Sequence, residues 1–331
     1  MYQVEIKENE AGQRLDKFLH KFMPLAPSSF FYKMLRKKNI TLNGKKAEGK
    51  EKLSAGDILS FYLSPETLKS FQESAGHYQA AYGEYERAYR ELKGISVIYE
   101  DAHVIIMNKP AGILSQKAKP EDISLNEWLI GYLLAGNLTN AEQLSTFKPA
   151  ICNRLDRNTI GLVIGAKSLA GSQKMNELIK SRNIRKFYQM IVKGHVRKEE
   201  TLEGYLQKDE KANKVRLTKE NFSGQAAYVK TRYYPLRKFA DRTLVEAELI
   251  TGKPHQIRIH LSSTGHPILG DYKYGDKVWN DKYKRQFHVS SQLLYACRLE
   301  MPELEAPFEG LSGMVIEAPE PEMFGKLKES E

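Results

Sequence analysis

Apolar positions recur with helical spacing in residues 12–64, where they predict a small module of two helices and a hairpin. We expect two apolar stripes on these helices. The first consists of Leu15, Phe18, Leu19 and Phe22, and the second of Phe31, Met34 and Leu35. Pro24 and Pro27 separate the two helices, and Ser28 and Ser29 are possible caps of the second. The stretch "NITLNGKKA" predicts a strand that enters an Asn-Gly turn, and "GDILSFYL" predicts a second strand.

The pattern changes twice further along the chain. Residues 65–94 are rich in Ala, Glu and Tyr and poor in large aliphatic residues, which indicates a linker with some helix, whose tyrosines could pack on either flanking domain. From residue 95 to 325, short runs rich in Val and Ile outnumber the helical stripes and follow one another closely. This order predicts an α+β domain on a long mixed, mainly antiparallel sheet with flanking helices.

Charge adds a candidate partner to this picture. The chain carries 51 Lys and Arg against 41 Asp and Glu, a formal net charge of +10. Residues 1–64 hold 12 of the basic and 7 of the acidic residues, so this fifth of the chain carries half of the excess. Exposed lysines alone could explain the excess, but a basic globular chain favours a polyanion, and nucleic acid before membrane.

The basic side chains of the N-terminal module gather at the predicted second helix end and at the hairpin: Arg36, Lys37, Lys38, Lys45 and Lys46. Two helices with a basic hairpin can grip RNA by its phosphates and shape. This pattern resembles the S4-type RNA-binding domain, which implies that residues 1–64 bind RNA through these five residues.

Composition and motifs exclude several other classes. The two cysteines form no CxxC pair and fit a reducing, cytoplasmic compartment. The sequence shows no signal peptide at its start and no apolar run of about 18 residues, so we expect a soluble protein without a membrane partner. No glycine-rich nucleotide motif occurs, and His255, His260 and His266 lack a zinc-site spacing, so we expect no cofactor and no metal.

The stretch "ICNRLDRNTIGLVIGAKS" places a carboxylate in a polar loop before a predicted strand. Asp156 lies between Arg154 and Arg157, which would favour its ionised form. An ionised carboxylate in a loop fixed by a sheet can act as a nucleophile or stabilise charge at a glycosidic carbon. A purely structural Arg–Asp pair fits the same pattern.

Two further segments offer candidate site residues. In "RKFYQMIVKGHV", Tyr188 and Phe187 should point to opposite faces of a strand, so the tyrosine either stacks on a base or belongs to the core. The segment "ITGKPHQIRIHLSSTGHPILGDYKYG" alternates like a strand, yet Pro254 and Gly265 suit the two ends of a helix, which we prefer. Either way, Arg258 could clamp a carboxylate or a phosphate.

Three segments occur in the order "NRLDRNTIGLVIGAKS", "KFYQMIVKG" and "GKPHQIRIHLSSTGHPILGDYKYG". Together they resemble the RluA-type pseudouridine synthases over roughly residues 95–300, and an S4-like module often precedes this domain in members that act on large-subunit rRNA. The resemblance implies isomerisation of uridine to pseudouridine in RNA, most often 23S rRNA, by a monomer without a cofactor. A tRNA target, a catalytically silent RNA-binding protein and a glycoside or nucleoside hydrolase are the alternatives.

The resemblance also implies a role for each matching residue. Asp156 matches the catalytic aspartate, Tyr188 the tyrosine that packs on the target uracil, and Arg258 the arginine that pairs with the aspartate. Arg154 matches the arginine that handles the extruded nucleotide, and Arg157 is a further candidate RNA contact. The chain departs from the common family pattern at five positions, which bear on the choice of target more than on the reaction: Asn153, Asn158, Ile160, Lys253 and Pro254.

Overall fold

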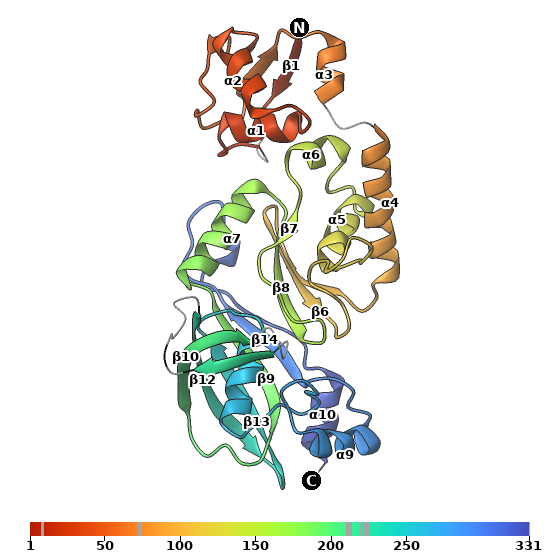
Figure 1. Ribbon diagram of the computed structural model, residues 1–331, viewed down its shortest axis with the longest axis vertical. Helices are drawn as coiled ribbons and strands as arrows, with labels where there is room; N and C mark the ends of the chain where they lie inside the picture. Colours follow the sequence, from red (N-terminus) through yellow and green to blue (C-terminus); the bar gives the residue numbers. More distant parts are fainter. Residues whose placement is uncertain (8–9, 72–74, 210–213, 219, 221–225, 331) are drawn as a thin grey trace.

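The N-terminal part of the chain forms a small sheet with two helices (Figure 1). The computed structural model describes all residues except 8–9, 72–74, 210–213, 219, 221–225 and 331. The four strands pair antiparallel in the order β1-β4-β2-β3. Their bounds are β1 Tyr2–Glu5, β2 Ile40–Leu42, β3 Lys45–Lys46 and β4 Ile58–Phe61, and the helices are α1 Leu15–Phe22 and α2 Ser28–Arg36. The predicted helices and hairpin are therefore present.

The structure of this unit confirms the predicted apolar stripes and hairpin turn, and it corrects the predicted helix caps. Both apolar stripes face one core, with only Phe22 half-buried among the predicted residues. Asn43 and Gly44 have φ of 51° and 72°, as a tight hairpin turn requires. The predicted serine caps are wrong: α2 follows Pro27 without a side-chain cap. Ser28 Oγ instead forms a hydrogen bond with His20 Nε2, 3.2 Å away.

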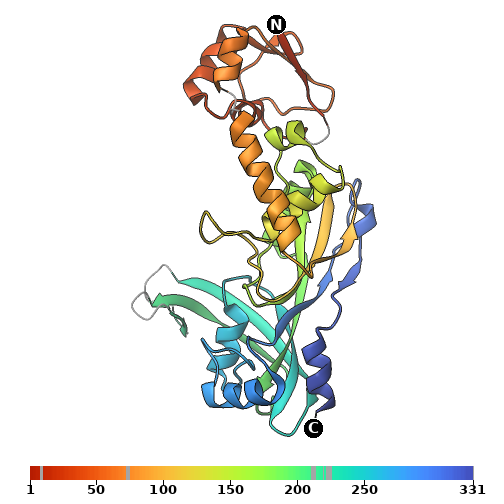
Figure 2. The ribbon, with the colours of Figure 1, turned by 90° about the vertical axis from the view of Figure 1, so that its right-hand side faces the viewer.

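The segment expected as a linker contains two helices, α3 Pro65–Phe71 and α4 Ala75–Glu91. Helix α4 packs along α5, Leu125–Ala135, so much of this segment belongs with the second part of the chain (Figures 1 and 2). The approach is close, because a Cβ on Gly131 would lie 2.2 Å from the Tyr85 carbonyl oxygen. The Tyr89 ring lies 5.8 Å from that of Trp128. Tyrosines and a glycine thus replace the aliphatic residues whose absence suggested a linker.

The second part of the chain is built on an 11-stranded sheet with the order β11-β10-β12-β13-β9-β14-β8-β6-β5. β7 and β15 lie off this path, on β8 and β14. Among the described residues, the β14–β8 pair is parallel and the other strand pairs of this sheet are antiparallel, so the expected mixed, mainly antiparallel sheet is confirmed. The strands are β5 Ser96–Glu100, β6 Val104–Lys109, β7 Ala150–Ile151, β8 Ile160–Ala166, β9 Arg185–Lys193, β10 Glu200–Asp209, β11 Lys214–Thr218, β12 Ala227–Lys238, β13 Arg242–Leu249, β14 Leu294–Glu300 and β15 Val315–Glu317.

Helices cover both faces of this sheet and divide its core. Besides α4 and α5, they are α7 Leu169–Ser181, α8 Gln256–Ser263, α9 Lys277–Phe287 and α10 Glu322–Glu329, with a short 3-10 turn at Glu309–Leu311. Helix α6, Ala141–Thr146, lies against α1 of the N-terminal unit instead. Side chains of α5 and α8 share one apolar cluster with Tyr188. Phe187 belongs to a different cluster, with α9 and α10. The predicted opposite orientation of Tyr188 and Phe187 is therefore confirmed.

Candidate active site

Asp156 lies in the loop between β7 and β8, and this loop is fixed on both sides. Leu155 is buried, and its backbone N–H and carbonyl both bond the Ser115 hydroxyl, at 3.0 and 2.8 Å. Asn153 accepts a hydrogen bond from the Ile164 N–H at 2.7 Å and so holds the loop to β8. The departure at Asn153 therefore supports the loop that presents the carboxylate.

Arg258 holds Asp156 from the first turn of α8. Its Nη1 donates to Asp156 Oδ2 at 2.8 Å, while its Nε and Nη2 donate to the two oxygens of Asp271 at 2.7 and 2.9 Å. Burial alone would lower the pKa of Arg258, but the two carboxylates outweigh it and raise that pKa above its ordinary value. The guanidinium is thus a fixed cation beside Asp156.

Asp271 is the buried anchor of this arrangement. It is 1% exposed, and besides Arg258 its Oδ1 accepts from the backbone N–H groups of Lys273 and Tyr274. Burial opposes ionisation, yet these donors and Arg258 lower the pKa of Asp271. Asp271 keeps Arg258 in one orientation, so the direction from which Arg258 meets Asp156 is set inside the protein.

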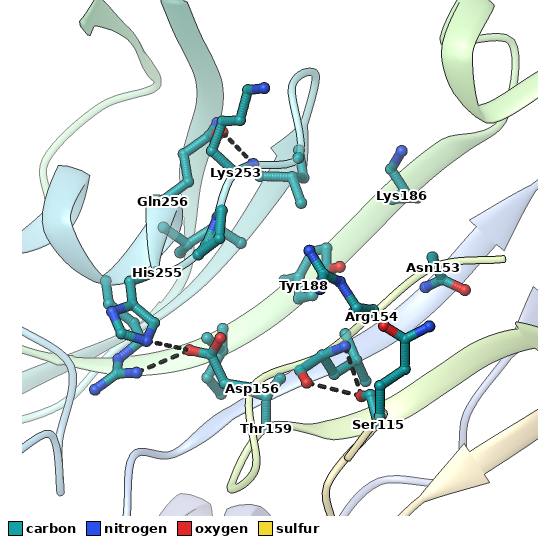
Figure 3. A pocket seen from close by; sticks show the side chains of 18 of the residues that line it. Ser115, Asn153, Arg154, Asp156, Thr159, Lys186, Tyr188, Lys253, His255 and Gln256 are labelled. Carbon is teal, nitrogen blue, oxygen red and sulfur yellow. Dashed lines mark hydrogen bonds and ion pairs between the residues drawn. The ribbon is translucent and has the colours of Figure 1, made fainter. Parts of the chain in front are cut away.

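His255 lies beside Asp156 (Figure 3) and approaches the same carboxylate oxygen as Arg258. Its Nε2 is 3.9 Å from Asp156 Oδ2, and its Nδ1 is 2.9 Å from the Tyr274 hydroxyl. The residue has φ of 58°, a left-handed conformation that is uncommon outside glycine. Burial lowers the pKa of His255, which the Asp156 charge only partly opposes. No hydrogen bond to Asp156 Oδ1 occurs among the described residues, so this oxygen is available to a substrate.

Asp156 lines a cavity of about 600 Å³. Tyr188 lines it from β9 and is 5% exposed, and Arg154 lines it as an exposed side chain. Burial, and then the Asp156 charge, raise the pKa of Tyr188, so its phenol stays protonated. The structure thus brings together Asp156, Tyr188 and Arg154 around one cavity (Figure 3), and Arg258 lines the same cavity.

The other predicted RNA contacts lie elsewhere. Arg157 is exposed and does not line the cavity; its Nε donates to the Gly112 carbonyl at 3.0 Å. The expectation that the neighbouring arginines stabilise Asp156 is therefore corrected, since Arg258 makes this contact. The five basic residues of the N-terminal module are all exposed, on the unit at the upper end of Figure 1. They are Arg36, Lys37, Lys38, Lys45 and Lys46.

Sequence reasoning missed three polar residues around the site. Asp271 stands in "GDYKYG", at the end of the segment that also holds Arg258. Lys109, in "NKPAG", is fully buried and donates to the carbonyls of Pro110, Ile113 and Arg157, so it ties the Asp156 loop to the segment after β6. Lys186 lines the cavity two residues before Tyr188. An acid or a lysine inside an otherwise apolar run was the available signal.

The described residues provide neither a membrane helix nor a metal cluster. Every helix in this part of the chain is too short or too polar to cross a bilayer. His255, His260 and His266 do not combine with other ligating side chains into a metal-holding group there.

Comparison with known proteins identifies the family. Residues 103–263 match the family model described as RNA pseudouridylate synthase. The chain is 30% identical over 320 residues to ribosomal large subunit pseudouridine synthase C of Vibrio cholerae, covering 92% of this chain and 93% of the relative. It is 28% identical over 285 residues to the Escherichia coli protein of that name, covering 84% and 81%.

Solved structures agree on the fold. Human RNA pseudouridylate synthase domain containing 4 is 22% identical with a TM-score of 0.54, and the match covers 75% of this chain and 95% of that one. Human RNA pseudouridylate synthase domain containing 1 is 20% identical with a TM-score of 0.53, and covers 71% and 86%. With a curated relative at 30% identity over nearly its whole length, the chain belongs to the RluA family of RNA pseudouridine synthases.

Proposed function

We propose that this protein isomerises specific uridines of large-subunit rRNA to pseudouridine. The curated relatives that match over most of the chain carry this substrate in their names. The observation that carries the proposal is the contact between Arg258 Nη1 and Asp156 Oδ2, 2.8 Å long, at the edge of a cavity lined by Tyr188. The cavity, about 600 Å³, has the size of small-molecule sites and so suits one extruded nucleotide.

In the proposed reaction, Asp156 acts on the ribose of the extruded uridine. Its free Oδ1 attacks C1′ or helps to remove the proton at C2′, and the N1–C1′ bond breaks. The detached uracil turns in the cavity and its C5 bonds to C1′; on the first route this breaks the bond between C1′ and the Asp156 oxygen, and on the second the proton returns to C2′. Afterwards C5 loses its proton and N1 gains one. Atoms and electrons balance without a redox partner.

The other residues hold the reacting groups in the proposed mechanism. Arg258, locked by Asp271, fixes Asp156 Oδ2 and leaves Oδ1 for the substrate. Tyr188 packs on the uracil with its phenol protonated, because burial raises its pKa. Arg154, exposed at the cavity, contacts the extruded nucleotide and its surroundings.

The N-terminal module supplies RNA affinity in this proposal, as an S4-like domain. Its support is the exposed hairpin lysines and the exposed basic end of α2, on a unit with its own apolar core. We further propose a cytoplasmic monomer, in keeping with the two unpaired cysteines. Light scattering of the purified protein tests the monomer.

Two measurements test the function. Pseudouridines are mapped in rRNA and tRNA of cells with and without the gene, and the site that disappears identifies the target. Purified protein is then incubated with an unmodified large-subunit rRNA transcript labelled with [5-³H]uridine, from which isomerisation releases tritium. Free uracil in place of pseudouridine would indicate a hydrolase, and modification of tRNA alone would contradict the rRNA target.

A further inference from the structure

Lys186 is a mostly buried lysine whose ammonium group is open to the cavity. It lies on β9, is 8% exposed and lines the cavity. No hydrogen bond or ion pair of its ammonium group occurs among the described residues. Burial lowers the pKa of Lys186, and the neighbouring Arg182 guanidinium lowers it further. The ammonium nitrogen is not fully enclosed by the protein, so a negatively charged group that enters the cavity can reach it.

A second buried lysine nearby shows how the protein satisfies such a group when its role is structural. Lys109 is fully buried, and its three N–H groups meet three backbone carbonyls at 2.9 to 3.0 Å. Lys186 has none of these partners, and it borders an open cavity. The contrast indicates that the partner of Lys186 comes from outside the chain.

The position of Lys186 defines which part of a substrate it can reach. Lys186 and Tyr188 are two residues apart and face the same side of β9, roughly 7 Å along the strand. Figure 3 shows Lys186 on the opposite side of Tyr188 from His255 and the Asp156 contact. A nucleotide with its base on Tyr188 and its ribose at Asp156 carries phosphates at both ribose ends, and these are its only full negative charges.

We propose that Lys186 forms a phosphate subsite for the RNA backbone next to the extruded uridine. The inference rests on the proposed function, because it takes the substrate to be a nucleotide within RNA. The subsite would discriminate an RNA-linked uridine from a free nucleoside, since the nucleoside brings no phosphate.

The experiment uses the full chain and the tritium-labelled rRNA transcript. Lys186→Met replaces the ammonium with an apolar side chain of similar length, and Lys180→Gln removes an exposed charge from the neighbouring α7 as a matched control. For each protein, kcat and KM are measured over a range of salt concentrations, and Tm is recorded.

Lys186→Met should raise KM by on the order of tenfold or more and leave kcat within a few-fold, since the contact exists before chemistry. The slope of log affinity against log salt should fall by roughly 0.7 to 0.9, the share of one phosphate contact. Tm should change little, because the methionine keeps the apolar stem and the described residues offer the ammonium no partner that the substitution would remove. Lys180→Gln should change KM much less.

An unchanged KM and salt slope in Lys186→Met would overturn the subsite. A loss confined to kcat, with the wild-type slope, would also overturn it and make Lys186 a support of Tyr188. If the wild-type protein releases no tritium from rRNA, the proposed target fails instead. Equilibrium binding of RNA to wild-type and Lys186→Met protein over the same salt range then still decides the subsite.

Discussion

Asp271 and Arg258 form a buried two-point pair, with Nε–Oδ2 and Nη2–Oδ1 distances of 2.7 and 2.9 Å. Only the remaining Nη1 of Arg258 reaches Asp156. Because the guanidinium is planar and Asp271 fixes its orientation, the position of the buried Asp271 carboxylate determines where Arg258 contacts the partly exposed Asp156 carboxylate. How precisely the proposed catalytic Asp156 is positioned therefore depends on Asp271, which does not line the cavity.

Replacing Asp271 with Asn should lower kcat by roughly 10²-fold, because Arg258 loses its two-point anchor and Asp156 is held less precisely. Breaking a buried pair should also lower the free energy of unfolding by about 3 kcal/mol or more. Tritium release and thermal unfolding measure the two effects. Asp281→Asn, on α9, is the control, and equal losses in both variants would argue against the anchoring role.

Asp156→Asn should abolish isomerisation and keep RNA affinity within a few-fold, because phosphate contacts dominate affinity. Arg258 stays paired with Asp271 in this variant, so Tm should change little. Tritium release and filter binding on the same transcript check both points. Substantial pseudouridine formation by the variant would reject Asp156 as the catalytic residue.

Arg258→Lys should strongly reduce kcat although the charge is kept. A lysine ammonium cannot present one N–H pair to Asp271 and a further N–H to Asp156 in one plane. We expect a loss of at least roughly tenfold. The measurement is single-turnover isomerisation at saturating RNA, and wild-type rates would mean that Arg258 contributes only its charge.

The sequence predicted local features well and distant pairings poorly. The alternation at Phe187 and Tyr188 follows from spacing and is present. The helix predicted from the turn residues Pro254 and Gly265 is also present, but it begins only at Gln256, because His255 before it has a left-handed backbone. Neighbouring residues suggested Arg154 and Arg157 as partners of Asp156, yet the contact comes from Arg258, 102 residues away. Only the family resemblance pointed to that pair. Chain spacing carries no information on which loops a sheet brings together.

The same limit applies to residues 65–94. Their composition lacks the aliphatic side chains that usually mark a packed helix, so they were expected to form a linker. Helix α4 instead packs by tyrosine rings and a glycine contact on α5, a mode that hydrophobic periodicity does not detect. Asp271 and Lys186 were overlooked for a related reason, since burial of a charged residue is a tertiary property.

Acid should destabilise the fold through His260. This residue is fully buried on α8, with Nδ1 2.9 Å from the Thr231 hydroxyl and Nε2 without a partner among the described residues. Burial lowers the pKa of His260 from 6.5 to about 4. Between these values the unfolded chain binds a proton that the folded chain does not, so stability falls as pH drops from 6.5 to 4.

The full effect is worth roughly 3 kcal/mol, and it should not grow further below pH 4. Urea unfolding at pH 7, 5.5 and 4.5 measures it. His260→Gln removes the titrating group and should flatten the loss, whereas His288→Gln, at an exposed position, should leave it unchanged. The same acid sensitivity in all three proteins would assign the effect to other groups.

The hairpin lysines should control the salt dependence of RNA binding. Lys45 and Lys46 are exposed on the two-residue strand β3, and the Asn43–Gly44 turn presents them away from the apolar core. If both contact phosphates, Lys45→Gln with Lys46→Gln should reduce the slope of log affinity against log salt by roughly 1.4 to 1.8. Turnover at saturating RNA should stay near wild type, because neither residue lines the cavity.

The matched control is Lys326→Gln with Lys328→Gln on α10, which removes the same charge from the other end of the chain. Equal slopes for the two double variants would mean that the hairpin acts only through net charge, and a hairpin variant inactive at saturation would mean that the module also shapes the active site.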